Sequence, residues 1–504
     1  MNIIFKTAMN GEETCIAENF HIHSSYNPSR EAQNFVKQLN VNFNPKYILV
    51  TEPGLSYCSK FLKERFPESI LTCIRFSNFF DKTNNKWQKI FYVYNDKQNS
   101  NSVFNQNLSE EIFSFFGDEG LATCFFISWN PSQIPFKEEY NFAWTQIKKA
   151  VLKSRKVLLT RNFFAKRWIK NSIRLVQNAK NNFTVKKGNF PILICASGPS
   201  LKSSIPFIIK NRKKFFLIAV SSALKPLIYN KIIPDFCIST DGGFWAKKHI
   251  SFATKNSKIP LAISSEGSCY ANILEKSDFI PLSYYDGIAD EILKICNFTS
   301  LKIQRNGTVS GTAALLALSL TSAPVFFCGL DLATNKSYQH TQPNELEIED
   351  SRFDNKFSTL ETRIFAQSIQ SSSLQIYKDW FSANDFGKDF YRLSDNYKFS
   401  NQLGKIKDIN WNDFETLVKP YNQKKCDIEI QKIFYKKQNY ELKIKNLINS
   451  NINNFLWQKE FVPSQAIVFE RSKGTQKENE ARLDLQNSLN DFLKSLNKLF
   501  PGQN

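Results

Sequence analysis

Short, continuous apolar runs recur through the middle of the chain, and stretches with helical spacing of apolar residues separate them. Continuous runs of this kind are typical of parallel strands that are buried on both faces of a sheet. Apolar residues three and four positions apart are typical of helices that cover such a sheet. The pattern predicts strands at 192–195, 216–220, 236–239, 261–264, 279–282 and 325–328, and helices at 205–212, 223–230, 271–276, 290–296 and 311–320.

This alternation predicts an α/β fold whose centre, residues 188–345, is a doubly wound, mostly parallel, Rossmann-like sheet. A smaller N-terminal α/β domain is expected over residues 1–136, with strands at 47–51, 70–74, 90–94 and 122–129, a helix at 56–65, and a loop or hairpin within 82–107. Residues 137–187 have the spacing of a linking helix. Few strand patterns remain after residue 350, and helical spacing at 363–382, 426–452 and 476–499 predicts a helical C-terminal domain over 350–504.

Charge adds one feature to the linking helix. The 504-residue chain has a formal net charge of +20, and residues 137–187 contain fourteen Lys and Arg against two Glu, a net +12. A basic helix can attract an anionic donor, an acidic partner, nucleic acid or an anionic membrane surface. A solvated helix face, which is the commoner reason for such a run, has the same composition. We expect no specific nucleic acid partner for this chain.

Cysteines and apolar segments indicate the compartment. The ten cysteines stand singly, with no CxxC pair and no Cys/His cluster at metal-ligand spacing, which fits a reducing cytoplasm. The apolar stretch at the N-terminus is too short for a signal peptide. The longest apolar stretch, 313–330, contains hydroxyl residues and a Pro break, whereas a membrane span needs about twenty apolar residues. We therefore expect a cytoplasmic protein without a transmembrane segment.

The first central strand is followed by a turn that suits a phosphate. Ser197, Gly198, Pro199 and Ser200 separate this strand from the next helical pattern. The glycine has no Cβ to hold a ligand away from the backbone, and Pro199 fits the first helical position. Ser200 and the N–H groups of the new helix can then face an anion. An ordinary strand-to-helix turn has the same composition, and neither GxGxxG nor GxxxxGK[ST] is present.

Polar residues also follow the other central strands, as a ligand site at the carboxyl edge of the sheet requires. They are Ser221 after the second strand, Asp241 after the third, Asp331 after the last, and Asn306, Ser310, Gly311 and Thr312 at the start of the helix before it. Asp241 stands where an acid commonly meets a ribose hydroxyl or a base edge, although a turn aspartate has the same setting. The segment at 310–312 is a second candidate anion site, or a plain helix cap.

His340 is the one histidine of four that follows the carboxyl end of the last central strand. An imidazole there can act as a general base because it titrates near neutral pH, although a lone loop histidine can also be incidental. The chain contains no Asp-x-Asp, Walker lysine, HExxH or GxSxG motif. We therefore expect a transferase at this site to work without a metal ion held by the protein.

Taken together, these segments resemble the motility-associated factor (Maf) family of flagellin glycosyltransferases. The resemblance is carried by SGPSL (197–201), VSSALKPLI (220–228), IIPDFCISTD (232–241), TVSGTAALLALSL (308–320), FFCGLDLA (326–333), SYQH (337–340) and, upstream, FAKRWIKN (164–171). The same core is similar to 6-hydroxymethylpterin diphosphokinase MptE-like proteins and to bacterial sialyltransferases that use a CMP-activated sugar. The resemblance covers about 160–345 well, the first domain loosely and the last hardly at all.

The resemblance implies a glycosyltransferase that moves a nonulosonic acid from a CMP-sugar to Ser or Thr of flagellin or another protein acceptor. It implies a nucleotide-sugar held at 197–200, Ser221, Asp241 and the 310–312 turn, with His340 beside the donor as base. The CMP-sugar is then a co-substrate, and we expect no permanently bound cofactor. We also expect the two glycine-bearing helix starts, near 200 and 310, to converge on one anionic pocket beside His340.

Two other functions remain open. An enzyme like the hydroxymethylpterin diphosphokinase would need ATP and Mg²⁺, and Asp241 and Asp331 are the obvious carboxylates to hold the metal. A non-catalytic flagellin-binding module would keep the fold without the chemistry. Nucleotide preference distinguishes the three functions, since only the first predicts a response to CMP and only the second a dependence on ATP and Mg²⁺.

Overall fold

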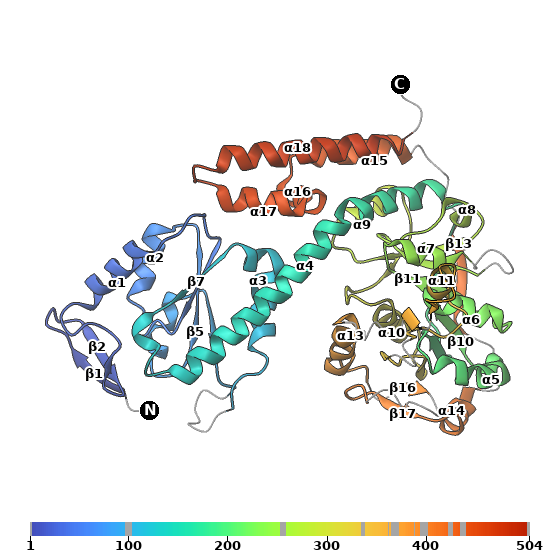
Figure 1. The fold of residues 1–504 in the computed structure, drawn as a ribbon, viewed down its shortest axis with the longest axis horizontal. Helices are drawn as coiled ribbons and strands as arrows, with labels where there is room; N and C mark the ends of the chain where they lie inside the picture. The colour runs from blue at the N-terminus through green and yellow to red at the C-terminus, as the bar shows by residue number, and fades with distance from the viewer. Residues whose placement is uncertain are drawn as a thin grey trace. The chain divides into compact units, whose positions relative to one another are not determined.

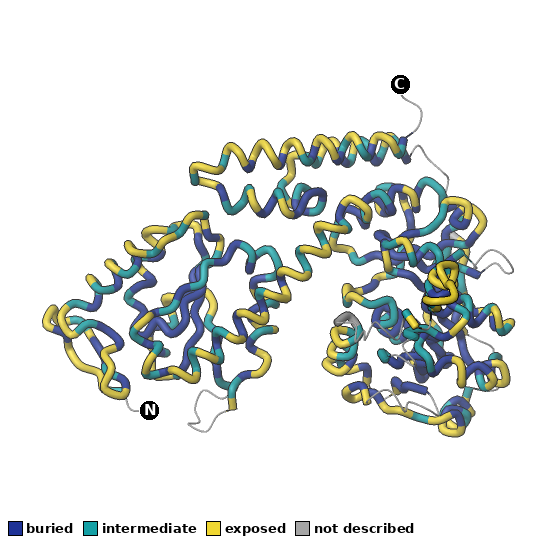
Figure 2. The backbone as a smooth tube through the Cα atoms, in the orientation of Figure 1, coloured by how far each residue is buried: buried dark blue, intermediate teal, exposed yellow. Residues whose placement is uncertain are grey.

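The computed structural model describes residues 3–95, 103–251, 259–333, 338–360, 362–363, 372–387, 389–393, 402–421, 427–433 and 440–500. The chain forms two compact units, one of residues 1–165 and 452–494, the other of residues 166–451 and 495–504. Figure 1 labels their elements, and Figure 2 shows that buried positions gather along the strands of both units.

The first unit is built on a four-stranded parallel sheet in the order β6-β5-β4-β7. Its strands are β4 (Tyr47–Thr51), β5 (Ile70–Arg75), β6 (Lys89–Tyr92) and β7 (Cys124–Ser128), close to the predicted ranges. Its helices are α1 (Pro28–Gln38), α2 (Cys58–Arg65), α3 (Leu108–Ala122) and the first part of α4 (Lys137–Asn178). A small antiparallel sheet of β1 (Ile3–Thr7), β2 (Glu13–Ala17) and β3 (Phe20–His21) was not predicted.

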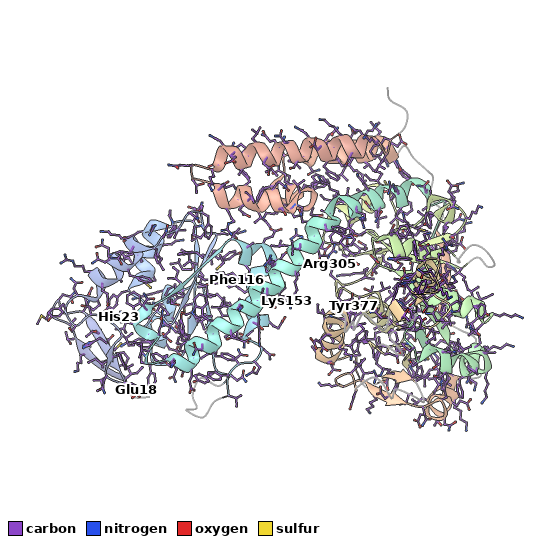
Figure 3. The ribbon with its side chains drawn as sticks, viewed as in Figure 1. Glu18, His23, Phe116, Lys153, Arg305 and Tyr377 are labelled. Carbon is purple, nitrogen blue, oxygen red and sulfur yellow. The ribbon has the colours of Figure 1, made fainter. Side chains whose placement is uncertain are left out.

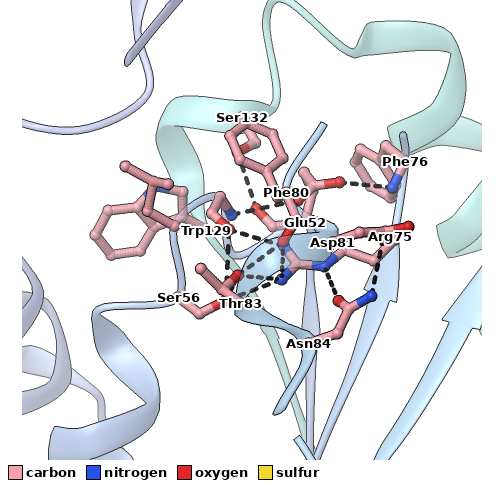
Figure 4. A network of polar contacts seen from close by, with 12 residues as sticks. Glu52, Ser56, Arg75, Phe76, Phe80, Asp81, Thr83, Asn84, Trp129 and Ser132 are labelled. Carbon is pink, nitrogen blue, oxygen red and sulfur yellow. Dashed lines mark hydrogen bonds and ion pairs between the residues drawn. The ribbon is translucent and has the colours of Figure 1, made fainter. Parts of the chain in front are cut away.

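A fully buried ion pair lies at the carboxyl ends of β4 and β5 (Figure 4). Arg75 Nη1 donates to Glu52 Oε1 over 2.9 Å, and the backbone N–H of Phe76 donates to Glu52 Oε2 over 2.6 Å. The other guanidinium nitrogens donate to Thr83 Oγ1 (2.7 Å) and Asn84 Oδ1 (3.0 Å). Burial raises the pKa of Glu52, while Arg75 and the backbone donors act in the opposite direction. The network satisfies a pair that would otherwise be costly to remove from water.

Three helices from the end of the chain complete the first unit. They are α16 (Phe455–Phe461), α17 (Pro463–Ser472) and α18 (Glu478–Asn497), and the rings of Phe461 and Phe492 pack with centroids 5.1 Å apart. Lys459 Nζ lies 2.7 Å from Glu119 Oε2 on α3, and Arg471 Nη1 donates to the carbonyl of Ala122 over 2.6 Å. Partly buried charge-assisted hydrogen bonds of this kind orient the helices on the unit.

The second unit is built on an eleven-stranded sheet in the order β17-β16-β15-β9-β10-β11-β12-β13-β8-β18, with β14 also paired to β13. Every pair is parallel except β18 with β8. The strands are β8 (Asn181–Lys186), β9 (Ile192–Cys195), β10 (Phe216–Val220), β11 (Phe236–Ser239), β12 (Leu261–Ser264), β13 (Asp278–Ser283), β14 (Leu301–Lys302), β15 (Val325–Cys328), β16 (Phe390–Leu393), β17 (Lys407–Ile409) and β18 (Glu429–Ile433). The predicted doubly wound, mostly parallel α/β fold is confirmed.

Helices cover both faces of this sheet. Residues of α10 (Val309–Leu320) and α13 (Ser372–Ala383) pack on one face, and those of α5 (Leu201–Asn211), α6 (Leu224–Tyr229) and α14 (Trp411–Val418) on the other. The unit also contains α7 (Phe244–Ile250), α8 (Ala271–Leu274), α9 (Ile288–Ile295), α11 (Glu345–Ser351) and α15 (Tyr440–Asn451). Strand β9 shows the alternation plainly, because Ile192 and Ile194 pack with α10 whereas Leu193 and Cys195 pack with α5. Side chains of successive strand residues point to opposite faces, so α5 and α10 lie on opposite sides of the sheet.

Residues after 350 differ from the separate helical domain expected for them. Strands β16, β17 and β18 join the central sheet, and only the helices after 452 belong to the first unit. These strands carry charged residues and lie toward the sheet edges, so they lack the apolar runs of the central strands. The helix expected at 426–452 is present only as α15, and Cys426 lies outside the described residues. Helix α18 confirms the one expected at 476–499.

Candidate functional site

The strand order of the second unit reverses direction at β9. The chain proceeds from β9 through β10, β11 and β12 to β13, and then returns to β15 on the other side of β9. In open α/β sheets, ligands bind outside the carboxyl ends of the strands at such a reversal. The segments that follow β9 and β15 therefore form the candidate site. Of the residues singled out by the sequence they contain Ser197, Gly198, Pro199, Ser200, Asp331 and His340.

Gly198 lies where these two turns meet. Its N–H donates to the carbonyl of Gly329 over 2.9 Å. A Cβ at Gly198 would collide with that carbonyl oxygen and with the carboxylate of Asp331. The glycine is therefore required by the close approach of the β15 turn to the β9 turn, rather than by the approach of a ligand.

Asp331 occupies the helix start that the sequence assigned to a phosphate. Its Oδ2 accepts the Ser200 N–H over 3.0 Å and the Ser200 hydroxyl over 2.8 Å. The next two N–H groups of α5, those of Leu201 and Lys202, donate to the carbonyls of Gly198 and Pro199. Burial raises the pKa of Asp331, and the two bonds from Ser200 act against that shift. The chain's own carboxylate therefore lies at the start of α5, at the helix end that favours negative charge. The phosphate expected there stays a prediction.

The segment that carries His340 is bonded directly to the β9 turn. The Thr341 N–H donates to the Ser197 carbonyl and the Thr341 hydroxyl to the Gly198 carbonyl, both over 2.6 Å. Asn344 Nδ2 donates to the Ser222 carbonyl over 3.3 Å, and the hydroxyls of Ser197 and Ser222 are 2.8 Å apart. The structure thus brings His340 to the carboxyl edge of β9, one residue from Thr341.

Two imidazoles and two carboxylates lie near one another at the His340 segment. His340 Nδ1 lies 3.7 Å from Glu347 Oε1, and His249 Nδ1 lies 2.7 Å from Glu345 Oε2. The two imidazole ring centroids are 6.3 Å apart. Glu345 and Glu347 are both buried at the start of α11. No arrangement of three or more His, Cys, Asp or Glu side chains in the described part of the chain is suited to hold a metal ion.

The second predicted anion site is the start of α10. Asn306 Nδ2 donates to Thr312 Oγ1 over 3.1 Å, and Asn306 Oδ1 accepts the Thr308 N–H over 3.0 Å. No side chain caps the first turn of α10, which contains Ser310 and Gly311. Helices α5 and α10 cover opposite faces of the sheet. At a reversal of strand order, helices on the two faces border the same crevice, so the expected joint pocket beside His340 stays a prediction.

Ser221 and Asp241 follow the next two strands. Ser221 is buried in the short 3-10 helix η4 (Ser221–Ala223) beside the β9 turn. Asp241 is exposed, and its Oδ1 accepts the Gly243 N–H over 2.7 Å, as in a turn. With β10 between them, the ends of β9 and β11 are two strand spacings, about 10 Å, apart.

The sequence analysis missed a charged cluster farther along the same edge, where Arg305 is labelled in Figure 3. Arg305 binds Glu266 through two hydrogen bonds (2.6 and 2.9 Å) and Asp286 through two more (2.7 and 2.9 Å). Its guanidinium carbon lies 4.1 Å from the ring centroid of Tyr284, whose pKa burial raises to about 12. Burial also raises the pKa of Glu266, against the effect of Arg305. The position of Glu266, two residues after β12, was the available signal.

Known proteins resemble this chain in sequence and in fold. Residues 166–337 match the family model described as 6-hydroxymethylpterin diphosphokinase MptE-like. A Maf glycosyltransferase from Magnetospirillum magneticum AMB-1 superposes on 98% of this chain and 91% of its own, with a TM-score of 0.53 and 8% sequence identity. The chain has the Maf fold.

The suspected relation to the Maf family, with an MptE-like centre, is thereby confirmed at the level of the fold. A protein of Treponema pallidum (strain Nichols), described as uncharacterized, is 28% identical over 279 residues, which are 55% of this chain and 61% of that relative. The match thus spans about three fifths of the relative's length. Within this Maf fold, no helix among the residues described is long and apolar enough to cross a membrane.

Proposed function

We propose that this protein is a cytoplasmic glycosyltransferase that moves a nonulosonic acid from a CMP-sugar to a Ser or Thr hydroxyl of flagellin, in support of motility. The observation that carries the proposal is the position of the His340 segment. Thr341 holds it to the turn after β9, at the reversal of a sheet in the Maf fold. This is where a ligand and a general base would meet.

The reaction needs a base and a stabilised leaving group. Nε2 of His340 takes the proton of the acceptor hydroxyl as its oxygen bonds to the anomeric carbon of the sugar. The bond between that carbon and the phosphate oxygen breaks, and its electron pair leaves with CMP. Groups that stabilise the growing negative charge on the phosphate lower the barrier, because they act mainly in the transition state.

The phosphate is assigned to the start of α10. Asp331 already occupies the start of α5, so an anion there would meet a carboxylate. Helix α10 is twelve residues long and has no side-chain cap, so Ser310, Gly311 and Thr312 are the proposed contacts, with Asn306 positioning Thr312. Asp241, exposed beyond β11, remains the proposed contact for the ribose or the base.

The ATP-dependent diphosphokinase is the less favoured function. Its metal would have to be held by Asp241 and Asp331, which follow β11 and β15. These strands are separated by β9 and β10 in the sheet, a distance of three strand spacings, or about 14 Å. Strand ends so far apart disfavour a shared Mg²⁺ site, because the oxygen ligands of Mg²⁺ lie at about 2.1 Å from the ion.

A nucleotide panel and one variant test the proposal. CMP should raise the melting temperature of the purified protein more than CDP, UDP, GDP or ATP with Mg²⁺, since binding to the folded state stabilises it. His340→Ala should abolish sugar transfer to flagellin while keeping the response to CMP. A preference for ATP with Mg²⁺ would support the diphosphokinase. No response to any nucleotide would favour a non-catalytic flagellin-binding module, and undiminished transfer by the variant would remove His340 from the mechanism.

A further inference from the structure

At the start of α11, two buried carboxylates lie beside two imidazoles, and only one of the two pairs is hydrogen-bonded. Glu345 Oε2 is hydrogen-bonded to His249 Nδ1 at 2.7 Å, which ties α11 to α7. Glu347 Oε1 lies 3.7 Å from His340 Nδ1, beyond hydrogen-bond length. The two pairs have the same chemistry, so their difference lies in geometry.

The open pair leaves polar atoms buried without a partner. His340 Nδ1 and Glu347 Oε2 have no hydrogen-bond partner in the structure, and the Glu347 side chain is only 6% exposed. Buried polar groups are nearly always hydrogen-bonded, because leaving one unpaired costs free energy. Closing the 3.7 Å gap pairs a nitrogen of His340 with the Glu347 carboxylate by a small movement. Catalytic hydrogen bonds are often long in a ligand-free structure and shorten in the complex.

The charged groups around His340 leave Glu347 as its natural partner. Glu345 is already engaged by His249, on the neighbouring helix α7. Lys248 of the same helix pairs with Glu349 of α11, and those two side chains are about 30% exposed, 2.8 Å apart. Within the described residues, His340 is the only cationic or potentially cationic side chain within 4.0 Å of the Glu347 carboxylate.

We propose that Glu347 is a positioning residue for His340. The carboxylate accepts the proton on Nδ1, so that Nε2 carries none and can take the proton of the acceptor hydroxyl. Which ring nitrogen carries the proton is set by the hydrogen bond that the other one makes. Glu347 also stabilises the imidazolium that forms when Nε2 is protonated. This inference rests on the proposed function, in which His340 is the base, but the tautomer can be measured without any substrate.

Imidazole NMR is the test, because the chain contains four histidines. In protein labelled with ¹⁵N at histidine, at a pH where the rings are neutral, we expect His340 to carry its proton on Nδ1. Comparison with His340→Ala assigns its signals, and His249, hydrogen-bonded through Nδ1, is the internal reference. A wild-type His340 protonated on Nε2 would overturn the proposal without any need for a further variant.

Glu347→Leu and a matched control complete the experiment. The leucine removes the acceptor with little change of size, so the His340 proton should move to Nε2 and the transfer rate should fall about 10²-fold or more. Glu349→Leu, on the exposed side of the same helix, should change neither. If wild-type transfer is observed and Glu347→Leu changes neither tautomer nor rate, the positioning role is refuted. If the tautomer shifts as expected but the wild type transfers no sugar, the proposed function fails and the pairing stands.

Discussion

Replacing Asp331 by alanine tests whether the start of α5 is a true anion site that the chain fills for itself. The substitution removes the acceptor of two hydrogen bonds, from the Ser200 N–H and the Ser200 hydroxyl. Leaving such a buried donor unsatisfied costs about 1–3 kcal/mol, and relief of the buried charge offsets part of this. We expect a net loss of about 2 kcal/mol, which corresponds to a fall in melting temperature of roughly 3 °C for a unit of this size.

The empty helix start should then bind an added anion. In a buffer without phosphate or sulfate, Asp331→Ala should melt below the wild type by that amount. Adding inorganic phosphate should restore part of the loss in the variant and little in the wild type, because the N–H groups at the start of α5 favour negative charge. Asp241→Ala is the matched control, since Asp241 also follows a strand but is exposed, and its loss should stay within about 0.5 kcal/mol.

The stability that Asp331 contributes depends on pH, and the direction follows from its pKa. Burial raises the folded-state pKa of Asp331 above its ordinary value near 3.8. The stabilisation that depends on this carboxyl is therefore fully present below pH 3.8 and declines as the pH rises through the folded pKa. The difference between wild type and Asp331→Ala should accordingly be smaller at neutral than at acid pH. Equal melting temperatures for the two proteins at acid pH, or an identical response of both to phosphate, would refute this account of the α5 start.

Two further substitutions test the packing around each sheet. Arg75→Leu leaves Glu52 buried without its cation and should lower the free energy of unfolding of the first unit, measured in urea, by about 3–5 kcal/mol. The double variant Arg75→Leu with Glu52→Leu should lose less of that free energy. Equal losses would show that the two side chains are not coupled. Gly198→Ala should cost about 1–3 kcal/mol, because its Cβ meets the Gly329 carbonyl, and Gly243→Ala, which meets only the movable Asp241 carboxylate, is the control; similar melting temperatures for the two alanine variants would contradict the close-approach argument.

The interior of the fold could be predicted from the sequence, and its edges could not. Strands β9, β10, β11, β12 and β15 match their predicted ranges because each is an apolar run buried on both faces. Strand β16 was missed because its core position is filled by Arg392, fully buried and paired with Asp408 of β17 over 2.6 Å. In a pattern of apolar and polar positions, a buried arginine looks like a surface residue. The burial of Arg392 depends on its ion pair with Asp408, which the sequence pattern does not show.

The candidate site was predictable only one turn at a time. The polar residues after β9 and β15 follow buried strands, so their place at the carboxyl edge follows from local pattern alone. The role of Asp331 as the acceptor at Ser200 depends on β15 being the neighbour of β9, and the sequence contains no signal for strand order. The same missing order is why the sequence could not place α5 and α10 on opposite faces of the sheet.

The helices that complete the first unit are synthesised long after the rest of that unit. Residues 1–165 leave the ribosome long before α16, α17 and α18, and at 5–20 residues per second the delay to residue 452 is roughly 15–60 s. During that interval Glu119 lacks the ion pair with Lys459, and the Ala122 carbonyl lacks the hydrogen bond from Arg471. A stop codon between the codons for residues 166 and 451 would therefore release a chain whose first unit lacks α16, α17 and α18 and exposes the surface they cover to chaperones and proteases.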